Sequence, residues 1–182
     1  MYVTADFDWT TGALSTDALA EFCKTYAPEL APGQSIEVNL AIDDWLTKVA
    51  AKLSQGFVIT VDYGEESGDL YNNLRRPEGS LRAFSQHGFV DSVLDQPGAH
   101  DITSTINWTQ VKSVGEKLGF KVVEFNSQDK FLLNAGLLDG LEHRLAGIQS
   151  EGERLSLTSG AREMILPGGM AASFQVLVQQ RV

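Results

Sequence analysis

The apolar residues that follow Thr16 recur at helical spacing. Leu19, Phe22 and Tyr26 lie three and four positions apart, and Thr16 is a residue type that can cap a helix N-terminus. Pro28 cannot continue a helix. The pattern therefore predicts a first helix from Thr16 to about Pro28, with Cys23 on its apolar face as a small core residue.

A second helical stripe begins after the Pro32-Gly33 turn. Its apolar positions are Val38, Ile42, Trp45, Leu46, Val49 and Leu53. Gly56 stands where a left-handed residue commonly ends a helix. The next run, Phe57 to Val61, is mostly β-branched and apolar on both faces, which is typical of a buried parallel strand. Helix followed by strand is half of an α/β repeat.

Regular periodicity stops between Gly64 and Asp101. The segment is rich in Gly, Asn, Arg, Ser and Asp, and irregular segments of this length are usually functional or disordered. Its apolar residues can anchor it to the rest of the chain. They are Tyr71, Leu74, Leu81, Phe84, Phe89 and Val90. We therefore expect a structured excursion over 64–101.

The remaining chain returns to regular patterns. Asn107-Trp108-Thr109-Gln110 has the form of a capping box, in which Gln110 reaches back to the cap, and Gly119 ends the helix that follows. Strands are predicted over 120–125 and 174–178, and helices over 131–145 and 155–165. The whole chain reads as one α/β domain, 1–182, without a repeat or a low-complexity linker.

Composition narrows the possible functions. The 182 residues include 14 Lys and Arg against 24 Asp and Glu, a net charge of −10. That balance disfavours nucleic acid as a partner. No apolar run reaches the length of a membrane span, no export signal is visible, and a lone cysteine fits a reducing compartment. We expect a soluble protein, cytoplasmic or, in a eukaryote, in the mitochondrial matrix.

Several ordered blocks carry a family resemblance over about residues 10 to 180. They are Ile36-Glu37-Val38-Asn39, Trp45-Leu46, Gly56 to Gly64, Gly79-Ser80-Leu81-Arg82, His87, Pro97-Gly98, Asp101-Ile102-Thr103, Phe131 to Gly136, and Met170 with Phe174 to Leu177. Their order and spacing resemble the C-terminal part of the MidA-like family of S-adenosylmethionine-dependent methyltransferases. That family includes a mitochondrial arginine methyltransferase that assists complex I assembly.

The resemblance implies the C-terminal half of a class I, Rossmann-like methyltransferase fold. Its sheet would be mixed, with the last two strands antiparallel. The cofactor of the complete family protein would be S-adenosylmethionine, bound by a glycine-rich turn after the first strand. The chain has 17 glycines and no Gly-x-Gly, so the resemblance places that turn upstream of Met1. We expect no cofactor site and no metal site in this chain alone.

Two blocks supply candidates for binding an acceptor substrate. Glu37 lies at or just before the predicted N-terminus of the second helix, and Asn39 belongs to the same block. Asp62 and Tyr63 follow the strand 57–61, at the sheet edge where α/β proteins place ligands. A carboxylate could orient a guanidinium for methyl transfer. Glu37 could instead be a helix-terminal charge, and Asp62-Tyr63-Gly64 simply a turn.

The predicted excursion supplies the other candidates. Arg82 could contact substrate or could pair with a carboxylate to hold the loop. His87 could transfer a proton or be a hydrogen-bonded structural histidine. Asp101 and Thr103 could bind substrate, although capping of local backbone is the simpler role. No residue is assigned as catalytic.

Two functions remain open. The first is the C-terminal segment of a methyltransferase acting on a protein arginine, with a protein acceptor as its partner. The second is a non-catalytic interaction module, or a separately encoded half, that needs its own N-terminal half or a second copy. No hydrolase, P-loop or zinc-protease motif is present.

Overall fold

A computed structural model of the chain describes residues 1–72, 74–86, 88–166 and 173–182. Its internal contacts form two compact units. The first unit contains Met1–Lys48 and Glu65–Val114, and the second contains Val49–Gly64 and Gly115–Val182. The single domain expected from the sequence stays a prediction.

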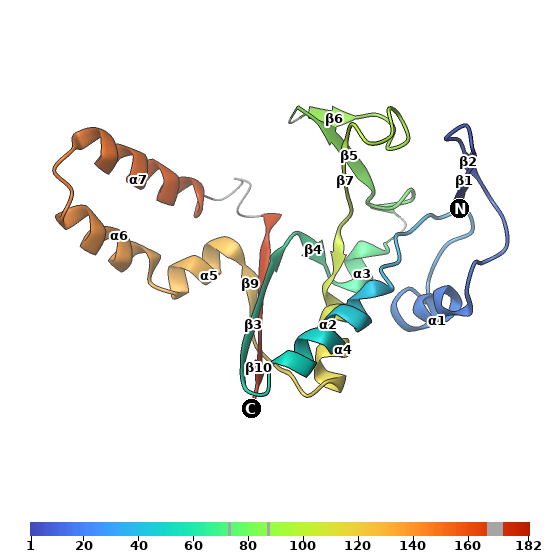
Figure 1. Cartoon of the computed structure of the whole chain (residues 1–182), viewed down its shortest axis with the longest axis horizontal. Coiled ribbons are helices and arrows are strands. Elements are labelled where there is room, and N and C mark those ends of the chain that lie inside the picture. The colour runs from blue at the N-terminus through green and yellow to red at the C-terminus, as the bar shows by residue number, and fades with distance from the viewer. Residues whose placement is uncertain (73, 87, 167–172) are drawn as a thin grey trace. The chain divides into compact units, whose positions relative to one another are not determined.

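The elements of the first unit are mostly short (Figure 1). They are β1 (Tyr2–Val3), β2 (Trp9–Thr10), α1 (Asp17–Tyr26), most of α2 (Ala41–Lys52), Glu65 of β4 (Gly64–Glu65), α3 (Ser67–Leu70), β5 (Arg82–Ser85), β6 (Gly88–Val90), β7 (Asp101–Thr103), β8 (Ile106–Asn107) and most of α4 (Trp108–Lys117). The hairpin of β1 and β2 has no counterpart in the sequence prediction.

Helix α1 forms where the sequence predicts it. The Thr16 hydroxyl accepts a hydrogen bond from the Ala18 amide, 3.3 Å away, and the helix ends at Tyr26 before Pro28. Phe22 packs edge-on against Tyr71, with ring centroids 6.1 Å apart. Together with Ala27 and Leu70 these rings form a buried cluster in this unit. The cluster fastens the segment after α3 to α1.

Helix α2 is shorter than its apolar stripe suggests. It covers Ala41–Lys52, so Glu37 lies four positions before its start, and Gly56 is the first residue of a strand rather than the end of the helix. Ile42 and Leu46 are buried, whereas Trp45 is 44% exposed. Two positions of the predicted stripe, Val38 and Leu53, therefore lie outside the helix.

Helix α4 begins at the predicted cap but uses it differently. The Asn107 side chain accepts from the Gln110 amide at 3.2 Å, as a cap should. The Gln110 side chain does not return to the cap. Its Nε2 donates instead to the Asn39 carbonyl at 2.9 Å and to Asp43 Oδ1 at 3.2 Å. That amide ties α4 to the start of α2 and is almost fully buried.

The segment between Gly64 and Asp101 contains more regular structure than its sequence indicates. β5 pairs antiparallel with β6 on one side and with β7 on the other. Ala83 at the centre of β5 is fully buried, while Leu74 and Phe89 are 93% and 73% exposed. Leu81 is exposed as well, so three of the six expected apolar anchors face solvent.

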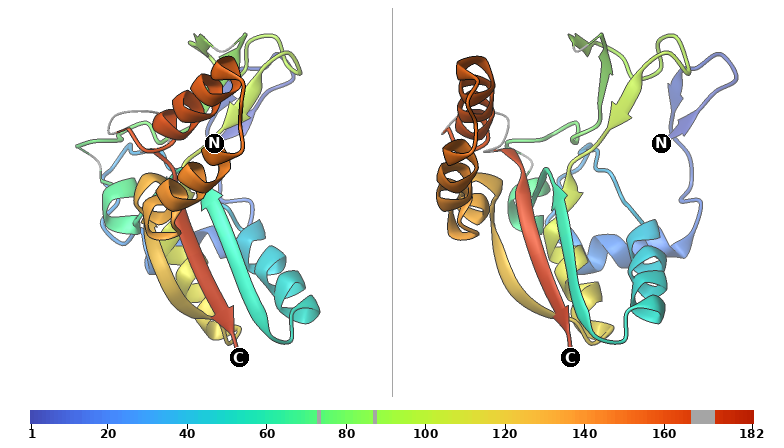
Figure 2. Two further views of the ribbon diagram at one scale, coloured as in Figure 1. Left: turned by 90° about the vertical axis from the view of Figure 1, so that its left-hand side faces the viewer. Right: turned by 60° about the vertical axis from the view of Figure 1, so that its left-hand side comes forward.

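Among its described residues, the second unit holds one sheet and three complete helices, together with the last residues of α2 and α4. Its elements are β3 (Gly56–Asp62), β9 (Lys121–Ser127), α5 (Gln128–Asn134), α6 (Leu137–Ala146), α7 (Glu151–Glu163) and β10 (Gln175–Arg181). β10 lies between β3 and β9 and runs antiparallel to both, as the arrows in Figure 2 show. The predicted antiparallel pairing of the last two strands is confirmed.

One prediction about the sheet of the second unit is wrong. Among the described strands every neighbouring pair in it is antiparallel, so the parallel pair expected of a mixed sheet is not found there. β3 and β9 share a direction but are separated by β10. β3 is also not buried on both faces, because its side chains alternate and Phe57, Ile59 and Val61 are 57%, 57% and 48% exposed.

The centre strand is the best-buried part of this unit. Val176, Leu177 and Val178 are at most 8% exposed, and Gln179 is 1% exposed. Both polar atoms of the Gln179 amide lack a hydrogen-bond partner among the described residues. A Cβ on Gly115 would lie 2.0 Å from Gln179 Nε2. Gly115 therefore leaves the space into which this buried amide fits.

The segment after β9 contains one more helix than the sequence predicts. The predicted helix over 131–145 is two helices, α5 and α6, separated at Gly136, whose φ of +85° favours glycine. α7 begins at Glu151, earlier than predicted, where Ser150 caps it. Figure 1 shows α7 folding back along α6. The predicted strands 120–125 and 174–178 correspond to β9 and β10.

Candidate functional site

Glu37 is the centre of a hydrogen-bonded clamp in the first unit. Its carboxylate accepts from the Ser80 amide and the Ser80 hydroxyl, both at 2.7 Å, and from the Leu81 amide at 3.1 Å. Gly79 has a φ of +84°, and a Cβ there would lie 2.3 Å from Glu37 Oε1. The loop before β5 thus wraps closely around one carboxylate, which gives Glu37 a structural role.

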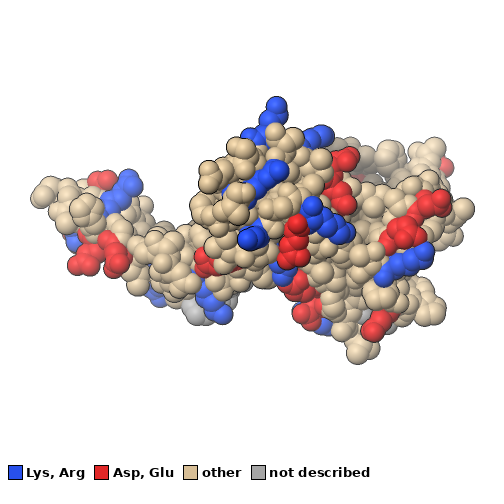
Figure 3. All heavy atoms as spheres, turned by 90° about the horizontal axis from the view of Figure 1, so that it is seen from below, with Lys and Arg blue, Asp and Glu red and all other residues tan. Residues whose placement is uncertain are grey.

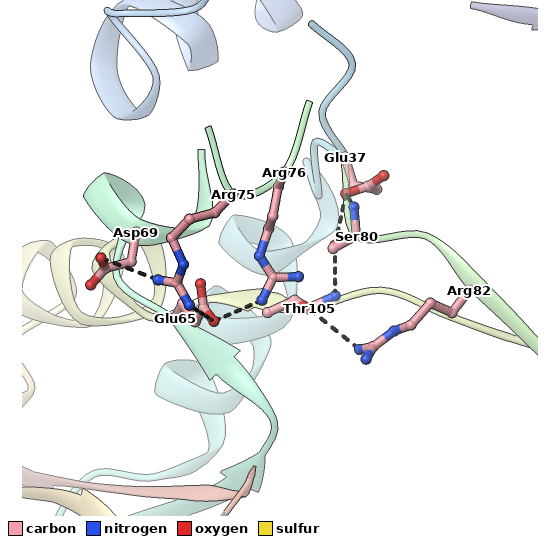
Figure 4. A network of polar contacts seen from close by, with 8 residues as sticks. All are labelled: Glu37, Glu65, Asp69, Arg75, Arg76, Ser80, Arg82 and Thr105. Atoms are coloured by element: carbon pink, nitrogen blue, oxygen red, sulfur yellow. Dashed lines mark hydrogen bonds and ion pairs between the residues drawn. The ribbon is translucent and has the colours of Figure 1, made fainter. Parts of the chain in front are cut away.

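The clamp continues to Arg82. The Ser80 hydroxyl also accepts from the Thr105 amide at 3.0 Å, and Arg82 Nη2 lies 3.4 Å from Thr105 Oγ1 (Figure 4). Arg82 therefore points along the strand pair toward Thr105. This hydrogen bond to a hydroxyl is neither the substrate contact nor the carboxylate pairing expected for Arg82, so both roles stay predictions.

A second set of charges lies beside the clamp in the same view. Glu65 accepts from Arg76 at 2.7 Å and lies 3.7 Å from Arg75, which is also 3.4 Å from Asp69 (Figure 4). Arg76 and Glu65 are mostly buried, so this pair is screened less than a surface pair. Their contact fixes the turn after α3 to β4. Sequence analysis did not single out either residue.

Hydrogen bonds of two titratable side chains, Tyr71 and Glu66, connect the segment around α3 to the start of α4. Burial raises the pKa of Tyr71 to about 12, although the hydrogen bond from Asn107 to its hydroxyl acts in the opposite direction. Burial also acts to raise the pKa of Glu66, but hydrogen bonds from Lys112 and Thr109 outweigh it and hold that pKa below its usual value. These contacts attach α3 to the first turns of α4.

The sheet of β5, β6 and β7 brings three predicted residues together. Arg82 is paired with Thr103, and Phe84 with Asp101, so these four side chains lie on one face. Asp101 and Thr103 therefore lie in a strand and not in a capping turn. Phe84 also faces Phe89 of β6, with ring centroids 4.6 Å apart.

Asp62 and Tyr63 lie at the end of β3 in the second unit. Asp62 Oδ1 accepts from the Tyr63 amide at 2.8 Å, a local turn contact. The Tyr63 ring packs edge-on against Phe174 at 5.4 Å. Asn39, in the first unit, accepts from the Ala41 amide at 3.0 Å and so opens α2. His87, predicted as a candidate, lies outside the described residues.

The residues that sequence analysis missed are Ser80, Thr105, Glu65 and Arg76. Ser80 stands inside a family block, and its burial to 4% exposure could not be read from a polar residue between Gly and Leu. Glu65 and Arg76 carried no periodic signal. Only the fold, by placing distant segments side by side, reveals these contacts.

Neither metal binding nor a membrane span is indicated in the described part of the chain. No three His, Cys, Asp or Glu side chains gather there in a way that could hold a metal ion. No helix there is long and apolar enough to cross a membrane. On the face drawn in Figure 3, basic and acidic side chains are interspersed, so the net charge of −10 does not form one patch on that face.

The fold and the sequence together place the chain in a known family. A family described as "Putative S-adenosyl-L-methionine-dependent methyltransferase" matches residues 2–126. Because the match covers more than half of the 182 residues, the chain belongs to this family. Among curated proteins none matches the sequence significantly.

Two solved structures share the fold, and both come from Burkholderia thailandensis. One is an uncharacterized protein, with 23% identity and a TM-score of 0.80 over 98% of this chain and 47% of its own. The other is described as a "likely methyl transferase" bound to S-adenosyl-homocysteine, with 23% identity and a TM-score of 0.81 over 98% of this chain and 46% of its own. The chain thus spans slightly less than half the length of either neighbour.

Proposed function

We propose that the chain is the C-terminal segment of a MidA-like, S-adenosylmethionine-dependent methyltransferase that modifies a protein arginine. The family assignment supports the methyltransferase class. The observation that carries the segment hypothesis is the edge strand β3, which has one neighbour among the described strands and an exposed apolar face. A preceding segment or a separate chain would cover that edge and supply the cofactor-binding turn.

Under this proposal, five of the candidate residues form two groups that could contact the acceptor. Asp62 and Tyr63 lie at the carboxyl end of β3, where ligands of α/β sheets bind. Arg82, Asp101 and Thr103 lie on one face of the β5 sheet. Glu37 and Asn39 hold the surrounding backbone in place. A carboxylate such as Asp62 would orient the guanidinium by charge-assisted hydrogen bonds.

The test compares the 182-residue chain with the same chain completed by its upstream segment or partner. We expect S-adenosyl-homocysteine to leave the melting temperature of the isolated chain unchanged. At a hundredfold excess over Kd, the completed enzyme should gain about 2.7 kcal/mol, or roughly 3 °C in melting temperature for a protein about twice as long as this chain.

Methyl transfer from labelled S-adenosylmethionine to protein acceptors would then be mapped by mass spectrometry. Methylated arginine supports the proposed acceptor chemistry, whereas methyl groups found only on other residues would contradict it. A clear rise in the melting temperature of the isolated chain would contradict the segment hypothesis.

The alternative is a non-catalytic interaction module that needs a partner chain. The exposed row of Phe57, Ile59 and Val61 favours it, because an apolar edge strand invites pairing. A completed complex that binds no S-adenosyl-homocysteine and transfers no methyl group would select this alternative.

A further inference from the structure

Three side chains form a row across one face of the sheet β6-β5-β7. The Cα partner of Phe84 is Phe89 on one side and Asp101 on the other. Directly paired residues of antiparallel strands project to the same face. The two phenyl rings are in contact, with centroids 4.6 Å apart and planes tilted by 36°. The row therefore places two aromatic rings beside one carboxylate.

This row is open to solvent at both ends. Phe89 is 73% exposed, so its ring is accessible to a partner. Asp101 is exposed as well, and within the described ranges no hydrogen bond or ion pair engages its carboxylate. On the opposite face, Ala83 is fully buried, whereas its β7 partner Ile102 is 58% exposed.

The charges of the surrounding segment have one dominant sign. Between Arg82 and Thr103 the chain carries Asp91, Asp95 and Asp101 against a single arginine. Arg82 lies on the same face as the row, two positions from Phe84, with its Nη2 directed to Thr105 Oγ1. Thr105 lies beyond Thr103 from Asp101 along the chain, so the guanidinium of Arg82 is directed away from the Asp101 carboxylate, which is the charge of the row itself.

We infer that the row Phe84, Phe89 and Asp101 binds an arginine-bearing segment of the acceptor protein. A guanidinium is flat, stacks on aromatic faces and pairs with carboxylates, so it can use both parts of the row. This inference rests on the proposed function and extends it by naming where the acceptor docks. The row is a docking surface, and no chemical step is assigned to it.

The experiment measures binding without cofactor or methyl transfer. A fluorescein-labelled peptide of Gly-Arg-Gly repeats is titrated with the 182-residue chain, and fluorescence anisotropy reports binding. Matched peptides carry Lys or Gln in place of Arg. We expect the Arg peptide to bind most tightly and the Gln peptide not to bind at the same concentrations.

Three variants separate the row from the rest of the sheet. Phe89→Ala should weaken binding of the Arg peptide roughly two- to fivefold, as loss of an exposed cation–π contact does. Asp101→Asn should weaken it about tenfold. Ile102→Ala is the control, since Ile102 is 58% exposed on the opposite face of the same sheet, and it should bind normally. Phe89→Leu, which keeps apolar bulk without the ring, replaces Phe89→Ala if that variant melts early.

The outcomes separate this inference from the proposed function. Equal effects at Ile102 and at the row, no effect at the row, or equal binding of the Gln peptide overturns the inference. Equal binding of the Lys peptide overturns its arginine specificity. Loss of a dimer in Phe89→Ala, seen by sedimentation, would mean that a second copy covers the row. Intact peptide binding with no methyl transfer in the completed enzyme would reject only the proposed function.

Discussion

Glu37 illustrates how one carboxylate can organise a loop. Its three hydrogen bonds to Ser80 and Leu81 are charge-assisted, which makes them stronger than neutral ones. We expect Glu37→Gln to lower the free energy of unfolding by about 1 to 3 kcal/mol, measured by urea denaturation. Glu29→Gln, at an exposed position, is the control and should change stability by less than about 0.5 kcal/mol. Unchanged stability in Glu37→Gln would remove the structural role and restore the acceptor-binding hypothesis for this residue.

Glu66 makes stability depend on acid pH. Its pKa in the folded chain lies below the usual 4.5, because the hydrogen bonds from Lys112 and Thr109 outweigh the effect of burial. A depressed pKa adds stability above the unfolded value, and that contribution is lost as pH falls through the folded pKa. In Glu66→Gln the melting temperature should therefore fall less steeply below about pH 4.5 than in the unchanged chain. Parallel pH profiles for the two proteins would show that the Lys112 contact does not stabilise the fold.

Local signals in the sequence identified helix ends, whereas distant contacts stayed hidden. Thr16 caps α1 through an amide two positions away, so its role could be predicted. Glu37 and Ser80 are 43 positions apart, and Gln110 reaches Asn39 across 71 positions. No local pattern encodes such pairs. The acceptor-site candidates were therefore chosen by their place in the family blocks and in the predicted elements, and the clamp that surrounds Glu37 emerged only from the fold.

At the scale of an element, β10 contains a buried group that costs stability. The Gln179 amide is 1% exposed and has no hydrogen-bond partner among the described residues. Met has a similar shape without the polar atoms, so Gln179→Met should raise the free energy of unfolding by about 1 kcal/mol or more. Thermal and urea denaturation would measure this. Gln180→Met, at the adjacent half-buried position, is the matched control and should have little effect. A clear loss of stability in Gln179→Met would show that the amide is hydrogen-bonded in solution.

Elements were predicted well where the apolar period was long and poorly where it was short or interrupted. Strand β3 stood out as a mostly β-branched run, and 174–178 within β10 was also predicted as a strand. The break between α5 and α6 was missed because apolar residues continue past Gly136, while only its positive φ reveals the turn. β5, β6 and β7 were missed because strands of three or four residues carry too little alternation to detect.

At the scale of the whole molecule, the exposed side of β3 should govern association. Phe57, Ile59 and Val61 are each about half exposed and lie on one side of an edge strand. We expect the isolated chain to self-associate as concentration rises, and Ile59→Thr to reduce that association while keeping a β-branched strand residue. Light scattering over a concentration series would measure both. Leu155→Gln, which removes a 68% exposed leucine from α7, should leave association unchanged. A chain that stays monomeric throughout, without binding a hydrophobic dye, would contradict this prediction.

The position of β10 between β3 and β9 also determines the order in which this sheet can form during translation. β3 hydrogen-bonds to β10, and β10 emerges from the ribosome only after everything from Tyr63 to Phe174 has been made. At about 5 to 20 residues per second, that interval lasts on the order of ten seconds. During that time β3 has no β10 to pair with. Chaperones that bind extended apolar segments should therefore crosslink to Phe57 to Val61 on stalled chains that end before about position 170 of this sequence, and should release this strand once β10 has left the exit tunnel.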